Sequence, residues 1–135
     1  MATTTAMLKC SKDEPAIEVE NEAQLDEWLD RLANGCSPGF PGIFRLCVHG
    51  YELEIGLGLG ESFVNIEHES GMPPYYLTLG EATAEGEVGF YLFGDHRTRI
   101  ARRNLIPTSQ ARGVVREFFA TGERSASVRW EKITG

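Results

Sequence analysis

The chain has 135 residues, 41% of them hydrophobic, and a formal net charge of −7. This composition suffices for a packed core and argues against wholesale disorder, and no apolar run approaches the roughly 20 residues of a membrane-spanning helix. The first five residues lack the basic start and apolar stretch of a secretory signal, and the three cysteines show no CxxC spacing. We therefore expect one cytoplasmic domain over residues 1–135, with no disulfide framework and no membrane contact.

The charge is unevenly distributed along the chain. Residues 1–95 hold four basic and seventeen acidic side chains, a net charge of −13, whereas residues 96–135 hold nine basic and three acidic ones, a net charge of +6. Such asymmetry between two parts of one chain indicates a charged partner.

Two short strands, at residues 7–10 and 16–19, are expected before a first helix at about residues 22–33. Asn21 is a suitable N-cap for this helix, and Gln24 takes the capping-box position. We expect Gly35 to end the helix in a left-handed conformation. Leucines and a tryptophan recur at helical spacing and acidic residues take the other face. The apolar stripe is Leu25, Trp28, Leu29 and Leu32, and the acidic face is Asp26, Glu27 and Asp30.

The middle of the chain is typical of strands joined by turns. The expected strands cover residues 43–48, 52–58, 63–67, 75–79 and 88–93. No helix intervenes between His49 and Phe93, so we expect antiparallel pairing. The strand at 88–93 is apolar on both alternating faces, which leaves open whether its aromatic side chains belong to the core or to an interface.

A second amphipathic helix is expected at about residues 109–120, after Pro107 and Thr108. Gly122 is its expected end, and a last strand follows at residues 127–131. The apolar stripe of this helix is Ala111, Val114, Val115, Phe118 and Phe119. Together these elements predict an α+β fold, an antiparallel β-sheet with two α-helices packed on one face.

Motifs that carry enzymatic chemistry are not apparent in the sequence. The glycine run at residues 56–60 precedes a strand rather than a helix and lacks Gly-Lys-Ser/Thr, which argues against a phosphate loop. His49, His68 and His96 lack the spacing of a zinc site. We therefore expect no metal and no cofactor.

Nine acidic residues and no Lys or Arg lie in the stretch from Glu52 to Asp95. This single-sign field disfavours binding of nucleic acid, whose phosphates need basic contacts, and favours a basic protein partner. Four arginines follow without an interleaved aromatic residue, and we expect them in a solvated loop, paired with acidic neighbours. They are Arg97, Arg99, Arg102 and Arg103. Direct binding of nucleic acid is not expected.

The C-terminal third carries a specific pattern. It consists of Ile106-Pro107, Ala111, Phe118-Phe119-Ala120-Thr121-Gly122, Arg124 and Val128-Arg129-Trp130-Glu131. This pattern closely resembles immunity protein family 1 (Imm1) of bacterial polymorphic toxin systems. One departure is clear, because many members have proline after the arginine, where this chain has Ser125.

The resemblance implies a non-catalytic protein that binds and blocks the toxic domain of a cognate toxin. Such toxins are often nucleases or nucleic-acid deaminases, including zinc-dependent DNA cytidine deaminases. The resemblance also implies structural roles for the motif residues, which are Ile106, Pro107, Phe118, Phe119, Thr121, Gly122 and Trp130.

The toxin-binding surface must then be inferred from physical arguments, and the acidic and aromatic stretch is the best candidate. The residues predicted to bind the toxin are Glu61, Glu67, Glu69, Tyr75, Tyr76, Glu81, Glu85, Glu87, Tyr91 and Asp95. The alternative is a small-molecule-binding or hydrolytic α+β domain that uses a carboxylate pair in a sheet cleft, and it predicts a concave pocket with perturbed carboxyl pKa values.

Overall fold

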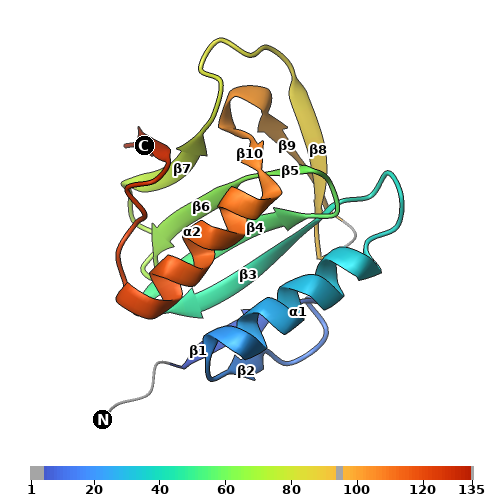
Figure 1. Cartoon of the computed structure of the whole chain (residues 1–135), viewed down its shortest axis with the longest axis vertical. Helices are drawn as coiled ribbons and strands as arrows, with labels where there is room; N and C mark the ends of the chain where they lie inside the picture. The colour runs from blue at the N-terminus through green and yellow to red at the C-terminus, as the bar shows by residue number, and fades with distance from the viewer. Residues whose placement is uncertain (1–4, 94–95, 135) are drawn as a thin grey trace.

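Figure 1 shows the computed structural model of the chain, which describes residues 5–93 and 96–134. The helices are α1 (Glu22–Gly35) and α2 (Thr108–Thr121), and a 3₁₀ turn, η1, covers Arg102–Asn104. The strands are β1 (Ala6–Lys9), β2 (Ile17–Val19), β3 (Gly42–Val48), β4 (Tyr51–Leu57), β5 (Glu61–Ser62), β6 (Val64–His68), β7 (Tyr75–Leu79), β8 (Glu87–Leu92), β9 (His96–Ala101), β10 (Ile106–Pro107) and β11 (Arg129–Ile133). Each expected helix and strand has a counterpart, and β5, β9 and β10 are additional.

Nine of the strands in the described residues form one sheet. Its main path runs β11-β7-β6-β4-β3-β1-β2, and each neighbouring pair in it is antiparallel. The exception to the antiparallel expectation is β8, which pairs in parallel with the first two residues of β3 and antiparallel with β9. The long loop after β7 carries the chain across the sheet (Figure 1). The strand β8 then pairs with β3 on the side opposite β4 and runs in the same direction as β3.

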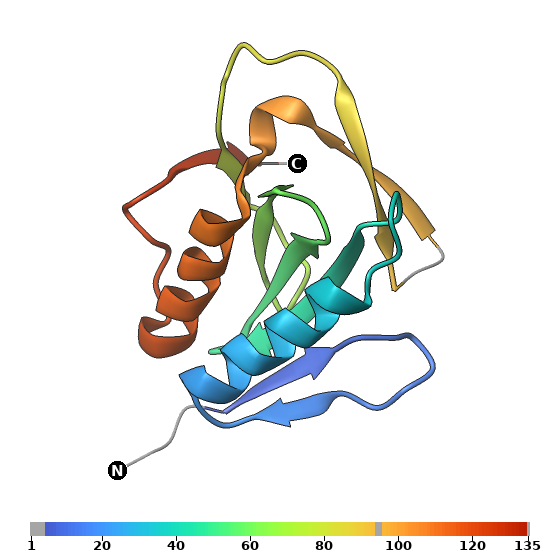
Figure 2. The same cartoon turned by 45° about the vertical axis from the view of Figure 1, so that its right-hand side comes forward.

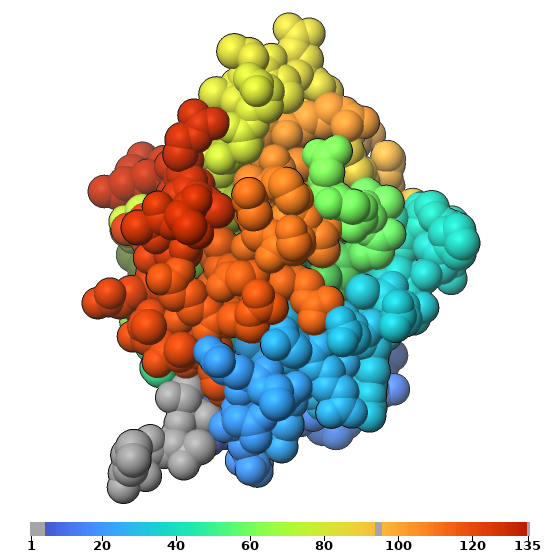
Figure 3. Space-filling model, viewed as in Figure 1, coloured from blue at the N-terminus to red at the C-terminus, as the bar shows by residue number. Residues whose placement is uncertain are grey.

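Both helices lie on the same face of this sheet, as expected (Figure 2). Alternate residues of the central strands point toward them, and the shared core buries Leu25 and Leu29 of α1 and Phe118 of α2 against Leu53 and Ile66 of the sheet. In the space-filling view from this side, α1 and α2 hide most of the strands (Figure 3). The core of the protein therefore sits between the helices and one face of the sheet, which leaves the other face without a helix. None of the helices in the described residues is long and apolar enough to span a membrane.

The helix α1 begins as expected and ends differently. The backbone N–H of Gln24 donates to the Asn21 side chain at 2.9 Å, while the Gln24 side chain accepts from the backbone N–H of Glu20 at 2.8 Å. The expectation that Gly35 ends the helix in a left-handed conformation is wrong: Gly35 is the last helical residue, and the chain leaves through an extended Cys36 with φ −72°. The Cys36 thiol donates to the Leu32 carbonyl at 3.2 Å, which ties the helix end.

The acidic face of α1 contacts α2 through ion pairs. Asp26 accepts from Arg116 at 2.9 Å, and Asp30 accepts from Arg112 at 2.6 Å. The two partly exposed aspartates therefore link α1 to α2.

The C-terminal motif builds the end of α2. Phe118 and Phe119 are buried, and Gly122 takes the left-handed conformation with φ 76° while its N–H donates to the Phe118 carbonyl at 2.8 Å. Only a residue without a Cβ adopts this conformation readily, so the expected helix end at Gly122 is confirmed. The Trp130 indole N–H donates to the Ser125 carbonyl at 2.9 Å.

Ser125, the departure from the family pattern, has a role of its own in this turn. Its side chain is buried, and its Oγ accepts from the Ser127 backbone N–H at 3.1 Å and lies 2.6 Å from the Ser127 hydroxyl. A side chain that hydrogen-bonds the backbone two residues on stabilises a turn without proline. The turn therefore survives the change.

A second cluster of buried residues settles the position of strand 88–93. Phe90 is fully buried with Phe63, Ile43, Ile100 and Leu105, on the side of the sheet away from the helices. The β8–β9 hairpin folds over one end of that face and covers it. Part of this strand is thus core, while Tyr91 is only half-buried.

The arginines that were expected in a loop lie in regular structure instead. Arg97 and Arg99 are on β9, and Arg102 and Arg103 form η1. Their expected pairing with acidic neighbours is confirmed for two of them: Arg99 lies 4.0 Å from Glu87, and Arg103 lies 3.2 Å from Glu131. The loop expectation is wrong because Thr98 and Ile100 face the second cluster and pair the segment with β8.

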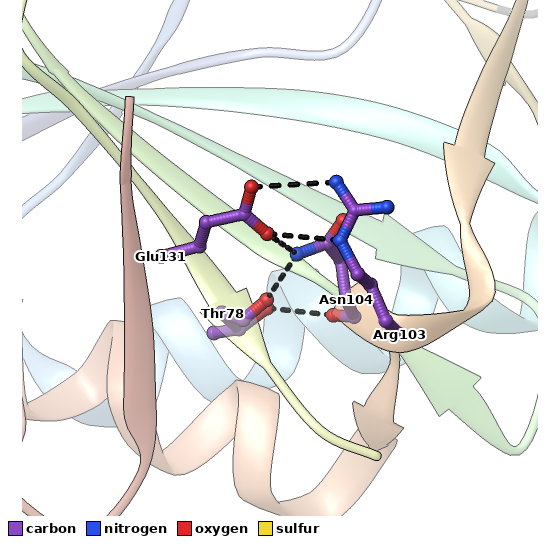
Figure 4. Close-up of polar contacts among 4 residues, drawn as sticks. All are labelled: Thr78, Arg103, Asn104 and Glu131. Atoms are coloured by element: carbon purple, nitrogen blue, oxygen red, sulfur yellow. Dashed lines mark hydrogen bonds and ion pairs between the residues drawn. The ribbon is translucent and has the colours of Figure 1, made fainter. Parts of the chain in front are cut away.

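A polar network anchors η1 to β7 and β11 (Figure 4). The buried Asn104 side chain donates to the Thr78 carbonyl and to Glu131, each at 3.0 Å. The Thr78 hydroxyl donates to the Asn104 carbonyl at 3.0 Å, and Arg103 also binds Glu131. Arg103 and Asn104 together hold the pKa of Glu131 below its ordinary value. This network is structural, because its members satisfy one another.

Candidate binding surface

The face of the sheet without helices carries the charged side chains of the central strands. Because side chains alternate along a strand, β4 points Leu53 and Ile55 toward the helices and turns Glu52 and Glu54 the other way. We call this surface the helix-free face and define it by residues whose register places them there. They are Arg45, Cys47, Glu52, Glu54, Asn65, Glu67, Tyr75 and Leu77.

Three carboxylates gather on the helix-free face around one arginine. Glu52 on β4 is the direct cross-strand partner of Glu67 on β6. The Arg45 guanidinium lies 3.0 Å from a carboxylate oxygen of Glu52 and 3.0 Å from one of Glu54. Arg45 thus contacts two of the three acids directly, and Glu67 forms no ion pair within the described residues.

The electrostatic cost of this arrangement falls on Glu67. Partial burial, followed by the nearby charges of Glu52 and Glu54, raises the pKa of Glu67 above its ordinary value, and Arg45 offsets only part of the rise. Like charges directly opposite one another in a sheet are destabilising. The face therefore holds a negative charge that the fold itself does not favour.

A hollow of about 380 Å³ lies where the β8–β9 hairpin meets the helix-free face. Its polar wall contains Glu54, Asn65 and Glu67, and Tyr75 stands at its side. The Tyr75 hydroxyl donates to the Gly71 carbonyl at 2.9 Å, which fixes the ring beside the carboxylates. The floor is apolar and consists of Ile43, Phe63, Leu77, Leu92, Ile100 and Ile133.

The structure brings some of the predicted toxin-binding residues together and separates others. Glu67 and Tyr75 share the helix-free face, and the exposed Glu69 follows directly after β6. Tyr76 points to the opposite side, where it stacks under Arg124 at 3.7 Å. Neighbouring residues of a strand face opposite ways, so the two tyrosines cannot serve one surface.

A second acidic group lies away from the helix-free carboxylates. Glu81 and Glu85 lie in the long β7–β8 loop, which projects at the top of the molecule (Figure 3). Glu87 begins β8, and Glu61 is exposed on β5 beside Val88. Tyr91 packs on Phe40 with ring centroids 5.1 Å apart. Asp95 lies outside the described residues.

Sequence reasoning did not include Arg45, Glu52 and Glu54 among the site residues. A signal for Arg45 was present, because the two-residue turn His49-Gly50 fixes the hairpin register and places Arg45 opposite Glu54. In the folded chain, Arg45 therefore contacts the acidic stretch from Glu52 to Asp95, which contains no Lys or Arg of its own.

Other candidate chemistry in the described residues is local. His68 Nδ1 lies 2.9 Å from the Ser70 hydroxyl inside one turn, and the thiols of Cys10, Cys36 and Cys47 are free. Burial raises the pKa of the Cys10 and Cys47 thiols, which favours the less reactive thiol form. No group of His, Cys, Asp and Glu among the described residues is arranged to hold a metal ion.

The fold is α+β, and its helix-free face is a sheet surface with three clustered carboxylates. The family model for immunity protein Imm1 matches residues 13–132, so the chain belongs to the Imm1 immunity protein family. The match extends from before β2 to β11 and includes both helices. No individual curated protein matches the chain. Family membership implies an immunity protein that binds a cognate toxin.

Proposed function

We propose that the chain neutralises a nucleic-acid-targeting toxin, such as a DNA cytidine deaminase, by covering the active-site groove with its helix-free face. An enzyme that acts on DNA or RNA needs Lys and Arg side chains to bind phosphates. A rigid sheet face bearing several carboxylates offers negative charges to such a groove and can exclude the substrate.

The observation that carries this proposal is the cross-strand pair of Glu52 and Glu67, two carboxylates placed opposite each other on the helix-free face. A partly buried carboxylate opposite Glu52, with a raised pKa, lowers the stability of the free protein. Stability lost at a surface is a common cost of function. A basic side chain of a toxin would offset the repulsion between Glu52 and Glu67, so this charge contributes more in the complex than in the free chain.

Charge reversal tests the proposal. The double variant Glu67→Lys/Glu69→Lys reverses charge on the helix-free face and at its border, where Glu69 follows β6 and contributes to the raised pKa of the Cys47 thiol. The matched control Glu81→Lys/Glu85→Lys makes the same net charge change in the β7–β8 loop. Titration of each against the cognate toxin domain should show at least about a 10-fold weaker affinity for the first variant, and a smaller change for the control. Equal affinity for wild type and Glu67→Lys/Glu69→Lys would refute the proposal. A larger loss in the control would move the site to the loop group.

The hydrolytic alternative has one observation in its favour. Glu54 and Glu67 line the same hollow, and the pKa of Glu67 is raised. A general acid with a raised pKa is a feature of carboxylate-pair enzymes. The two proposals differ in the effect of Glu67→Gln: the toxin-binding proposal expects weaker toxin affinity, whereas the alternative expects a catalytic activity of the isolated chain that this change removes.

A further inference from the structure

A second hollow, also about 380 Å³, opens at the end of α1. It is lined by the last turn of α1, the start of β3 and the residue that follows β8. Figures 1 and 2 both show the end of α1 beside the end of β8. The walls of the hollow are largely apolar, and Arg31 and Ser37 supply the polar part of the lining. We call it the aromatic hollow and define it by Leu32, Gly35, Cys36, Phe40, Phe44 and Phe93.

One of the three aromatic rings of this hollow is open to solvent. Phe40 is 56% exposed, although it packs on Tyr91 at a centroid distance of 5.1 Å. Phe93, in the turn after β8, is half-buried. The exposed ring of Phe40 therefore lies at the edge of the hollow, where a partner can contact it.

Glycine at position 42 makes room for the Phe44 ring in the wall of the aromatic hollow. A Cβ on Gly42 would lie 2.8 Å from the Phe44 ring, so only glycine lets this ring fold back over β3. At the rim, a Cβ on Gly35 would meet no atom within 4 Å. The space beside Gly35 is therefore free to receive a side chain.

The aromatic hollow is continuous with the helix-free face. Phe93 lines the hollow, and the Arg45 guanidinium lies 5.3 Å from the centre of its ring. The same guanidinium lies 3.0 Å from Glu52 and from Glu54. A partner that covers the carboxylates therefore reaches the aromatic rings without a gap. Its surface must be basic at one place and apolar beside it.

We propose that the toxin inserts an apolar side chain, located beside its basic groove, into the aromatic hollow. This inference rests on the proposed function. Charged pairs set the encounter rate and the register of a complex, and buried aromatic anchors supply most of the affinity. The toxin's side chain would be the anchor and Phe40 and Phe93 walls of the pocket that receives it, while Glu67 and its neighbours would provide the register.

Two independent variants test the aromatic hollow against the cognate toxin domain. Phe40→Ala removes an exposed ring, and we expect its affinity to fall about 10- to 100-fold, while Phe40→Leu keeps apolar bulk and stays within about 3-fold of wild type. Gly35→Leu adds an apolar side chain at the edge of the hollow and should weaken binding similarly by obstructing it, with Gly35→Ala as its matched control. Circular dichroism and thermal unfolding of each variant verify that the fold is intact.

The outcomes separate this inference from the proposed function. If Glu67→Lys/Glu69→Lys weakens binding but Phe40→Ala and Gly35→Leu do not, the hollow receives no anchor and the acidic face alone binds the toxin. If the hollow variants weaken binding and the charge reversal does not, the proposed function fails in its choice of surface. A wild-type dimer that Phe40→Ala dissociates, seen by sedimentation, would instead identify a second copy as the occupant and overturn the inference.

Discussion

Glu52 and Glu67 lie directly opposite one another on adjacent antiparallel strands, two carboxylates in a position where opposite charges would stabilise the sheet. Arg45 contacts Glu52 and Glu54, yet burial and repulsion still raise the pKa of Glu67. The pair is therefore maintained against the stability of the free chain. We expect such a pair on a surface where a bound partner supplies the basic side chains that neutralise it.

The first prediction concerns the stability cost of Glu67. Its folded-state pKa is raised above the ordinary 4.5, so its ionisation lowers the free energy of unfolding as the pH rises through that pKa. Glu67→Gln should be more stable than wild type by about 0.2–1 kcal/mol at pH 7, and the difference should shrink below pH 4.5. Urea unfolding of both proteins at pH 7 and at a pH below 4.5 measures this difference in the free energy of unfolding. A less stable variant at pH 7 would show that the charge supports the fold.

The second prediction concerns the network around Glu131. Arg103 and Asn104 lower the pKa of Glu131, so its contribution to stability is present above the ordinary value of 4.5 and is lost as the pH falls through the lowered pKa. Glu131→Gln should cost about 1 kcal/mol at pH 7, with no difference from wild type at strongly acidic pH. Thermal unfolding across this range is the measurement, and a pH-independent difference would contradict the linkage.

The third prediction concerns close packing at Gly56. A Cβ there would lie 2.6 Å from the Phe90 ring and 2.9 Å from the Phe63 ring, both fully buried. Gly56→Ala should therefore cost about 1–3 kcal/mol by overpacking. Gly113→Ala is the control, because its Cβ would meet only Arg116 at 3.8 Å and should stabilise α2 by about 0.5–1 kcal/mol. Urea midpoints of the two variants should move in opposite directions; a shared direction would refute the packing argument.

The fourth prediction concerns Phe118, the buried ring at the end of α2. Its edge faces Tyr51 at a centroid distance of 5.6 Å and His49 at 6.1 Å. Phe118→Ala should leave a cavity and cost about 3–5 kcal/mol, whereas Glu117→Ala, at the exposed neighbouring position, should stay within about 0.5 kcal/mol. Chemical denaturation gives both values. An unchanged free energy of unfolding for Phe118→Ala would contradict this prediction, because it would mean that neighbouring side chains fill the cavity at no cost.

Much of the fold could be predicted because local signals agreed with tertiary packing. The stripe of α2 and the stop at Gly122 are confirmed residue by residue. The two-residue strands β5 and β10 were missed because they are too short to show a period. The strand β9 was missed because its arginines suggested a solvated loop, although Thr98 and Ile100 alternate with Arg97 and Arg99 as strand residues do.

The candidate surface was less predictable, because a run of acidic residues in the sequence does not specify a face. Alternation sends Tyr75 and Tyr76 to opposite sides, and the β7–β8 loop carries Glu81 and Glu85 away from Glu67. Arg45 enters the acidic stretch only through the β3–β4 register. The exposed position of Phe40 depends on how α1 ends, which the sequence pattern predicted wrongly at Gly35.

Competition for the toxin tests the central claim most directly. A labelled oligonucleotide bound to a catalytically inactive cognate toxin domain should be displaced by the wild-type chain and by Glu81→Lys/Glu85→Lys, and much less by Glu67→Lys/Glu69→Lys at the same concentration. The affinity of the wild-type chain for the toxin, measured without oligonucleotide, should weaken with added salt, because the helix-free face acts through charge. A stable ternary complex of toxin, oligonucleotide and wild-type chain would contradict the account.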